Sequence, residues 1–176
     1  MLVTWKAGLV VSAAVAMVAA MSTDAWGAGR VAVAAPVAAA APAGGWAEPE
    51  ADVSHHGHVS LWGSELGLWL HSENHGPSDL DGATVRLRFS AVLAGRQEMP
   101  VECLQADART VLCRTGPLPA DGSAGRQLAL ELRLAGRPKA VVVRIDTVWN
   151  GGATDRNLQN DQHQVSAFAT GDEYVF

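Results

Sequence analysis

The stretch LALELRL, residues 128–134, decides between the two ways in which this chain could fold. Leucine stands at every second position, and alanine, glutamate and arginine fill the positions between. Leucine, glutamate and arginine are good helix formers, so propensity alone would favour a helix. A strict period of two, however, puts every leucine on one side of a β-strand and the other side chains on the opposite side. The stretch therefore predicts a half-buried strand.

The same period recurs through the chain from residue 57 onward. Apolar residues alternate with other residues in 59–61, in 66–70 and in VRLRF at 85–89. The run 140–149 is rich in β-branched residues and nearly continuous, which is typical of a central strand buried on both faces. A last strand is expected at 165–170, after a polar loop.

Turn residues separate these segments at intervals of about eight to twelve residues, the spacing of a β-sandwich. We therefore expect an all-β domain over 57–171, an antiparallel β-sandwich of about seven to eight strands. Residues 172–176 are expected to form a C-terminal tail. One domain of this size can bury a core of its own.

Residues 1–27 have the three parts of a secretory signal peptide. Lys6 supplies the positive charge, 7–21 form an apolar run, and the small residues that follow suit a signal peptidase, with cleavage as late as 34 as an alternative. An uncleaved membrane anchor is the other alternative, but a helix over 7–21 spans only about 22 Å of a hydrocarbon core of about 30 Å. We expect a secreted protein that meets the membrane only during export.

Residues 28–56 are rich in alanine, proline and glycine and show neither helical nor strand periodicity. This composition predicts a disordered linker between the signal peptide and the sandwich.

Cys103 and Cys113 are the two cysteines of the chain. Both lie in short apolar stretches, and the turn-like segment 105–109 would bring them face to face across a hairpin. An oxidising compartment makes a disulfide the expected state. The spacing is not that of a CxxC redox pair, so a structural bridge is favoured.

Composition and motifs exclude several functions. The formal net charge is −5, from 13 basic and 18 acidic residues, whereas nucleic-acid binders need a basic surface. No serine stands in a G-x-S-x-G context, and no pair of carboxylates stands out for glycoside hydrolysis. We expect no enzyme, no catalytic residue and no cofactor.

The histidines His55, His56 and His58 form the strongest candidate for a metal site, because imidazoles bind zinc, copper or nickel. His71 and His75 could complete such a site if the fold brings them near. A solvated polar patch is the more common outcome at a domain border, so no metal site is expected and the cluster stays an alternative. Oxygen-bearing side chains could hold calcium, but their spacing differs from that of a calcium loop; they are Asp146, Asp155, Asn157, Asn160 and Asp161.

Three tryptophans, Trp62, Trp69 and Trp149, lie in or beside predicted strands. Exposed indole rings there would suit stacking against a sugar polymer. The favoured expectation is instead that they fill the core or cover the second face of a sheet. Trp69 is out of phase with its leucine neighbours and should face away from them.

The segment LHSENHGPSD, residues 70–79, resembles the Asn-x-Gly-Pro-Ser-Asp signature of a bacterial surface repeat, the eleventh domain of unknown function. The other landmarks of the repeat follow in order over about 58–170, in a single copy: the cysteine hairpin, a Gly-Ser turn at 116–123 and the loop DRNLQND at 155–161. This loop is similar to the Asp-x-Asn-x-x-Asn-Asn loop of the repeat, with Asp161 in place of the last Asn. The resemblance implies an immunoglobulin-like fold, export and no catalytic residues. The matching motif residues are Asn74, Gly76, Pro77, Asp79, Asp155, Asn157 and Asn160.

These expectations favour a secreted, non-enzymatic protein with a structural, adhesive or binding role at or outside the bacterial cell envelope. Its partner is unknown, and a cell-wall polymer or a surface protein would fit. The alternative is an exported metal-binding protein that uses His55, His56 and His58.

Overall fold

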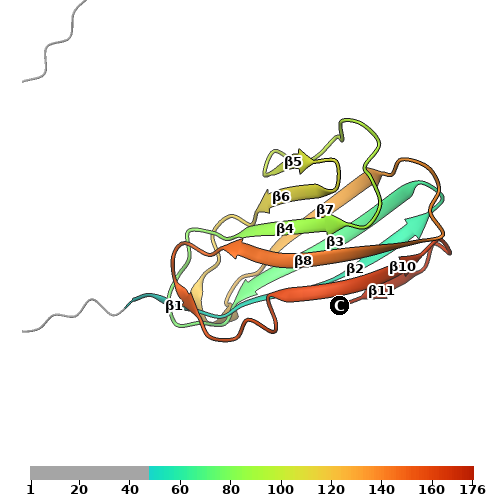
Figure 1. Cartoon of the computed structure of the whole chain (residues 1–176). Coiled ribbons are helices and arrows are strands. Elements are labelled where there is room, and N and C mark those ends of the chain that lie inside the picture. Colours follow the sequence, from blue (N-terminus) through green and yellow to red (C-terminus); the bar gives the residue numbers. More distant parts are fainter. Residues whose placement is uncertain (1–47) are drawn as a thin grey trace, which may run out of the picture. The chain divides into compact units, whose positions relative to one another are not determined.

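The computed structural model describes residues 48–176 (Figure 1). The predicted signal peptide and most of the predicted linker therefore lie outside the described residues. Between residues 48 and 176, no helix is long and apolar enough to cross a membrane.

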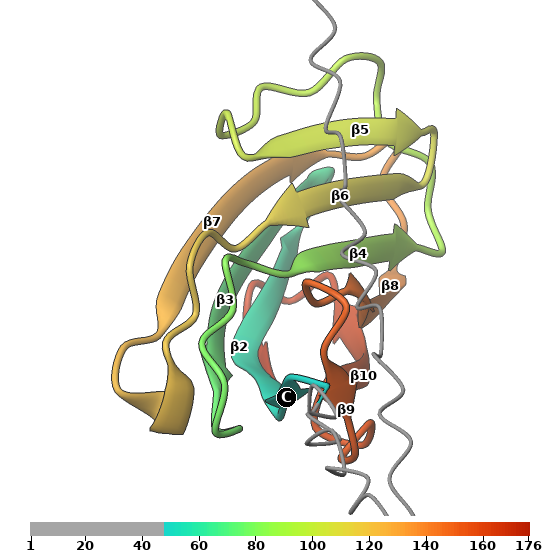
Figure 2. The ribbon, with the colours of Figure 1, turned by 90° about the vertical axis from the view of Figure 1, so that its left-hand side faces the viewer.

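The domain is an immunoglobulin-like β-sandwich of two antiparallel sheets, which confirms the predicted fold class (Figure 2). The strands of the five-stranded sheet are, in spatial order, β10 (Gln162–Phe168), β8 (Ala140–Trp149), β4 (Thr84–Phe89), β6 (Thr110–Arg114) and β5 (Cys103–Asp107). Those of the four-stranded sheet are β11 (Glu173–Val175), β2 (Val53–Trp62), β3 (Glu65–Asn74) and β7 (Arg126–Arg133). Two short strands, β1 (Glu50–Ala51) and β9 (Thr154–Asp155), pair in parallel. A 3-10 turn, η1 (Ala120–Gly122), interrupts the loop before β7.

Period-two alternation builds the core, as predicted. In β7, Leu130 and Leu132 are buried while Glu131 and Arg133 are exposed. Leu130 and Leu132 pack with the inward side chains of β3, β4 and β8 in the main core, which lies between the two sheets. Burial of one face thus outweighs the helix propensity of LALELRL.

The expectation for 140–149 is partly wrong. β8 is central in its sheet, but only one of its faces is fully buried: Val141 and Val143 point inward, whereas Arg144 is exposed. The outer face of β8 carries Asp146, whose carboxylate pairs with the guanidinium of Arg86 on β4. An open face of an antiparallel sheet tolerates such charges.

The sandwich extends beyond both predicted boundaries, 57 and 171. β2 begins at Val53, which is fully buried, so part of the segment predicted as linker is core strand. At the other end, β11 pairs with β2 through Tyr174 and Val59, so the predicted tail is an edge strand. The alternation of apolar residues does not reveal these strands, because the start of β2 is polar and β11 has only three residues.

Cys103 and Cys113 form the predicted disulfide. They face each other in the register of β5 and β6, with their Cα atoms 4.1 Å apart. The turn between the strands is shorter than expected, because β5 continues to Asp107. The bridge fastens the edge strand β5 to the sheet.

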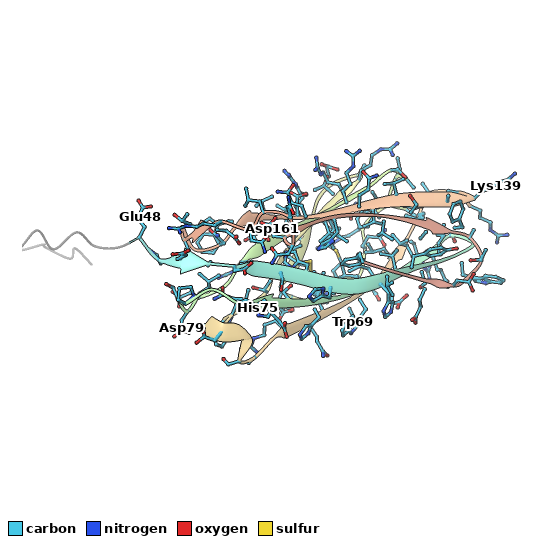
Figure 3. The ribbon with its side chains drawn as sticks, turned by 90° about the horizontal axis from the view of Figure 1, so that it is seen from below. Glu48, Trp69, His75, Asp79, Lys139 and Asp161 are labelled. Atoms are coloured by element: carbon cyan, nitrogen blue, oxygen red, sulfur yellow. A yellow bond between two sulfur atoms is a disulfide. The ribbon has the colours of Figure 1, made fainter. Side chains whose placement is uncertain are left out.

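The two ends of the sandwich differ, and we name them by residues that Figure 3 places far apart. The proximal end contains Glu48, where the described chain begins, and the distal end contains Lys139. A second, small core closes the proximal end; its buried residues are Ala51, Val53, Leu80, Ala83 and Leu118.

Candidate functional site

The structure separates the histidines of the predicted cluster. Because side chains alternate along β2, His55 faces the interior and is fully buried, whereas His56 is exposed on the other side. His58 shares the outer side and stacks on Trp69. Among the described residues, no three His, Cys, Asp or Glu side chains are arranged to hold a metal ion. His55, one of the three histidines considered as an alternative metal site, therefore does not share a site with His56 and His58.

His55 instead belongs to a buried polar group between the sheets. Its Nδ1 lies 3.0 Å from Ser72 Oγ and its Nε2 lies 2.8 Å from Thr147 Oγ1. Burial lowers the pKa of His55 to about 4, so the imidazole is neutral at pH 7. A neutral imidazole has one donor and one acceptor nitrogen, and the two hydroxyls satisfy both. Sequence reasoning missed this role, although the phase of Val59 and Leu61 would have placed His55 on the inward face.

Asp161 is a second buried group, with 3% of its surface exposed. Burial, followed by the nearby Asp155 carboxylate, raises the pKa of Asp161 to about 6. One of its oxygens, Oδ1, has no hydrogen-bond partner within the described chain. Asp161 is thus held in a site that disfavours its charged form.

The first motif, residues 74–79, ties the proximal end together. Asn74 is fully buried, and its Oδ1 accepts hydrogen bonds of 3.1 Å from the backbone N–H groups of both Asp52 and Gly76. Its Nδ2 donates to the carbonyl of Ser78 at 2.8 Å. Gly76 is required there because a Cβ would lie 2.5 Å from the Cα of Ala51.

The rest of that motif holds the neighbouring loop. Asp79 Oδ1 accepts a 2.8 Å hydrogen bond from the N–H of Ala120, the first residue of η1. Pro77 is exposed in the turn.

The second motif docks the loop 155–161 on the start of β2. Asp155 Oδ2 accepts from the N–H of Val53 and Oδ1 accepts from the N–H of Asn157, both at 2.9 Å. The amide of Asn160 donates to Asp52 Oδ1 at 2.7 Å. Both carboxylate oxygens of Asp155 are used in these structural bonds, and Asp146 is engaged with Arg86 on the outer face. Among the described residues, Asn160 Oδ1 and Asp161 Oδ1 are buried without a hydrogen-bond partner. Asn74, Asp79, Asp155 and Asn160 therefore form a structural hub, which the exposed Asn157 joins only through its backbone.

The outer face of the four-stranded sheet carries a row of rings. His58, Trp69 and His71 stack nearly parallel, with centroids 5.7 and 6.0 Å apart. Glu73 lies between two imidazoles, with His71 Nε2 at 2.9 Å and His75 Nε2 at 3.2 Å. The hydrogen bond from His71 lowers the pKa of the Glu73 carboxyl. Trp69 thus covers the second face of a sheet, as expected.

Trp62 and Trp149 contradict the expectation that the tryptophans are covered. Trp149, at the proximal end of β8, is 50% exposed, and Trp62, the last residue of β2, is 68% exposed. Beneath the Trp62 ring lies Gly171: a Cβ on this glycine would approach the ring carbon Cε3 to 3.2 Å. One face of the indole is therefore supported by backbone.

Trp62 borders an open hollow of about 540 Å³ at the distal end. The turn between β2 and β3 forms one wall and the segment before β8 forms the other. Charged residues line the hollow on both walls: Glu65 on one, and Arg137 and Lys139 on the other. An aromatic ring beside charged residues of both signs can bind a polar ligand that also has an apolar face.

Comparison of the chain with protein-family models, with curated proteins and with solved structures finds no match.

Proposed function

We propose that this protein is an exported, non-catalytic binding module that adheres to a polysaccharide at or outside the bacterial cell envelope. The observation that carries the proposal is the exposure of Trp62 on its glycine support, beside the charged groups of the distal hollow.

The chemistry of the hollow fits a sugar. The C–H groups of a pyranose ring form an apolar face that an indole can cover, and Trp62 lies at the end of a strand with its ring against Gly171. Arg137 and Lys139 can donate hydrogen bonds to hydroxyl or acidic groups, and Glu65 can accept them. Because the binding group is already positioned, little conformational entropy is lost on binding.

The position of the hollow suits adhesion. It lies at Lys139, at the opposite end of the sandwich from Glu48, where residues 1–47 join (Figure 3). A module attached through its N-terminal segment would present the hollow outward. The Cys103–Cys113 bridge supports export, since disulfides persist in oxidising compartments.

The buried polar group supports a non-catalytic role. Ser72 and His55 resemble part of a nucleophilic set, but they are 2% and 0% exposed and lie between the sheets. A substrate would have to open the core to reach them. The resemblance to the surface repeat agrees with this interpretation, because it implies no catalytic residues.

The test is retention of the protein on insoluble polysaccharide prepared from purified bacterial cell wall. We compare the unmodified chain with two variants. Trp62→Ala removes the indole beside the hollow, and the matched control Trp149→Ala removes an exposed indole from the proximal end of the sandwich. Trp62→Ala should weaken retention at least about tenfold, the scale of a tryptophan hot spot, and Trp149→Ala should not change it.

Equal retention of all three proteins would contradict the assignment of the hollow. The proposal that the ligand is a polysaccharide would be contradicted if the unmodified chain is not retained on any wall polysaccharide, either in its native form or after its acidic groups have been removed.

A further inference from the structure

The outermost strands of the two sheets differ in how their edges are protected. β5 is short, its pairing with β6 is irregular, and the disulfide fastens it. β10 and β11 lie against each other and close one side of the sandwich (Figure 1). β7 has eight residues and pairs with β3 in an unbroken register. It contains no proline or lysine, two residues by which proteins often block an exposed edge.

The hydrogen bonds at the end of β7 show which backbone groups face outward. The N–H of Arg133 donates to the Gln97 side chain and its carbonyl accepts from the N–H of Ala94, both on the side away from β3. The next residue, Leu134, donates toward the turn that precedes β3, to the carbonyl of Ser64. Because backbone direction alternates along an antiparallel strand, Gln127, Ala129 and Glu131 also point their N–H and C=O groups to the free edge. Within residues 48–176, these groups have no backbone partner outside the strand pair.

We propose that β7 pairs antiparallel with β7 of a second copy of this chain, about a two-fold axis at Ala129. In this register Ala129 faces its own counterpart, and Gln127 faces Glu131 of the second copy. Gln127, Ala129 and Glu131 then form hydrogen-bonded pairs, and each pair exchanges two backbone hydrogen bonds. The pairing ends before Arg133, whose outward backbone groups are already bonded to Gln97 and Ala94. The same surface serves both copies, as a two-fold dimer requires.

The side chains of β7 fit this register on both faces. On the outer face, the exposed Gln127 can donate its amide to the exposed Glu131, and no two like charges oppose each other. On the inner face, the half-buried Leu128 lies opposite Leu130 of the second copy. The small side chain of Ala129 leaves room at the axis. A second copy is therefore the partner whose side chains match this edge.

A groove beside the edge strengthens the case. It has a volume of about 280 Å³, and Leu70, Val85 and Leu128 form its apolar part, next to Gln127 and Ala129 of β7. The charged residues Glu102, Arg114 and Arg126 also line the groove. A strand added to β7 would shield the half-buried Leu128 beside it from water, which the hydrophobic effect favours.

The experiment measures self-association of the full chain, with its disulfide formed, by sedimentation velocity over a range of concentrations. Gln127→Glu places like charges opposite each other twice across the axis, and Gln127→Lys places opposite charges there twice. The Kd should rise about two- to tenfold in the first variant and fall by a similar factor in the second. Gln159→Glu, which adds the same charge in an exposed loop, controls for net charge and should leave the Kd unchanged.

Ala129→Pro removes an N–H that only the second copy uses, and an edge strand tolerates proline on its free side. It should weaken dimerisation at least about tenfold and leave the thermal midpoint of the dilute protein nearly unchanged. In a second measurement, amide exchange at Gln127, Ala129 and Glu131 should slow as the concentration of unmodified protein rises.

A monomer at every concentration would overturn the proposal. So would a dimer whose Kd moves in the same direction in both Gln127 variants, or one whose three edge amides exchange at a rate independent of concentration.

Discussion

The proximal and distal ends of the sandwich use polar residues in opposite ways. At the proximal end, Asn74 and Asp155 are turned toward the backbone and hold loops in place. At the distal end, Arg137 and Lys139 line an open hollow beside the exposed Trp62. The end that is richest in recognisable motifs is thus structural, and the plainer end carries the proposed ligand site. A short motif of Asn, Asp, Gly and Pro identifies loop architecture more readily than it identifies binding.

The largest effect should come from breaking the proximal hub at Asn74. Asn74→Ala would remove a fully buried side chain and leave two backbone N–H groups and a carbonyl without their partner, at a cost of about 2–4 kcal/mol in the free energy of unfolding. Urea denaturation measures the loss. Asn157→Ala, which removes an exposed amide from the second motif, is the control and should cost under about 0.5 kcal/mol. Similar losses in both variants would contradict the hub.

Acid should weaken the proximal end through His55. Its pKa is about 4 in the folded protein and about 6.5 when unfolded, so between these values the unfolded chain binds the extra proton. Stability should therefore fall as the pH drops from about 6.5 toward 4, by up to about 3 kcal/mol from this residue.

Asp161 acts in the opposite direction, because its raised pKa makes the folded state bind the extra proton between about 3.8 and 6. Its contribution to stability is present at low pH and is lost as the pH rises through this window. Asp161→Asn should therefore steepen the acid loss and stabilise the protein at pH 7. Unfolding free energies across pH 4–7 measure both effects, and a His55→Gln variant with an unchanged acid profile would contradict the assignment.

Reduction of the Cys103–Cys113 bridge should have an effect of similar or smaller size. The closed loop is short, so its opening should lower the free energy of unfolding by about 2–3 kcal/mol. The paired Cys103→Ser and Cys113→Ser variant tests this against the oxidised protein. Because the bridge fastens only the edge strand β5, the far-UV spectrum of the sandwich should be retained, and a global loss of strand signal would show that the hairpin supports the whole fold.

The pattern of apolar residues predicted most of the fold, because each strand carries its own signal in a few consecutive residues. Alternation in LALELRL, in VRLRF and around the cysteines reports one-sided burial strand by strand, and that property also defines a sandwich. It failed where a strand does not use aliphatic residues: the inward positions of β2 near its start are His55 and Gly57. Gly57 is there because a Cβ would lie 2.1 Å from the carbonyl oxygen of Trp69, a contact between strands that no single segment reveals.

The candidate site could be predicted less well, for the same physical reason. The exposure of Trp62 depends on where β2 ends and on Gly171, which is more than a hundred positions later in the chain. Arg137 and Lys139 line the hollow because β7 ends and β8 begins at the distal end of the sandwich. The clustered histidines suggested a metal site in the sequence, but the alternation of side chains along β2 places them on two different faces of the sheet.

The most direct test of the division between the two ends compares Trp62→Ala with Asn74→Ala in two measurements, affinity for cell-wall polysaccharide and free energy of unfolding, at a temperature where both variants are folded. Trp62→Ala should lose at least about tenfold in affinity and keep its stability within about 0.5 kcal/mol, and Asn74→Ala should do the reverse. Undiminished affinity in Trp62→Ala would contradict the account.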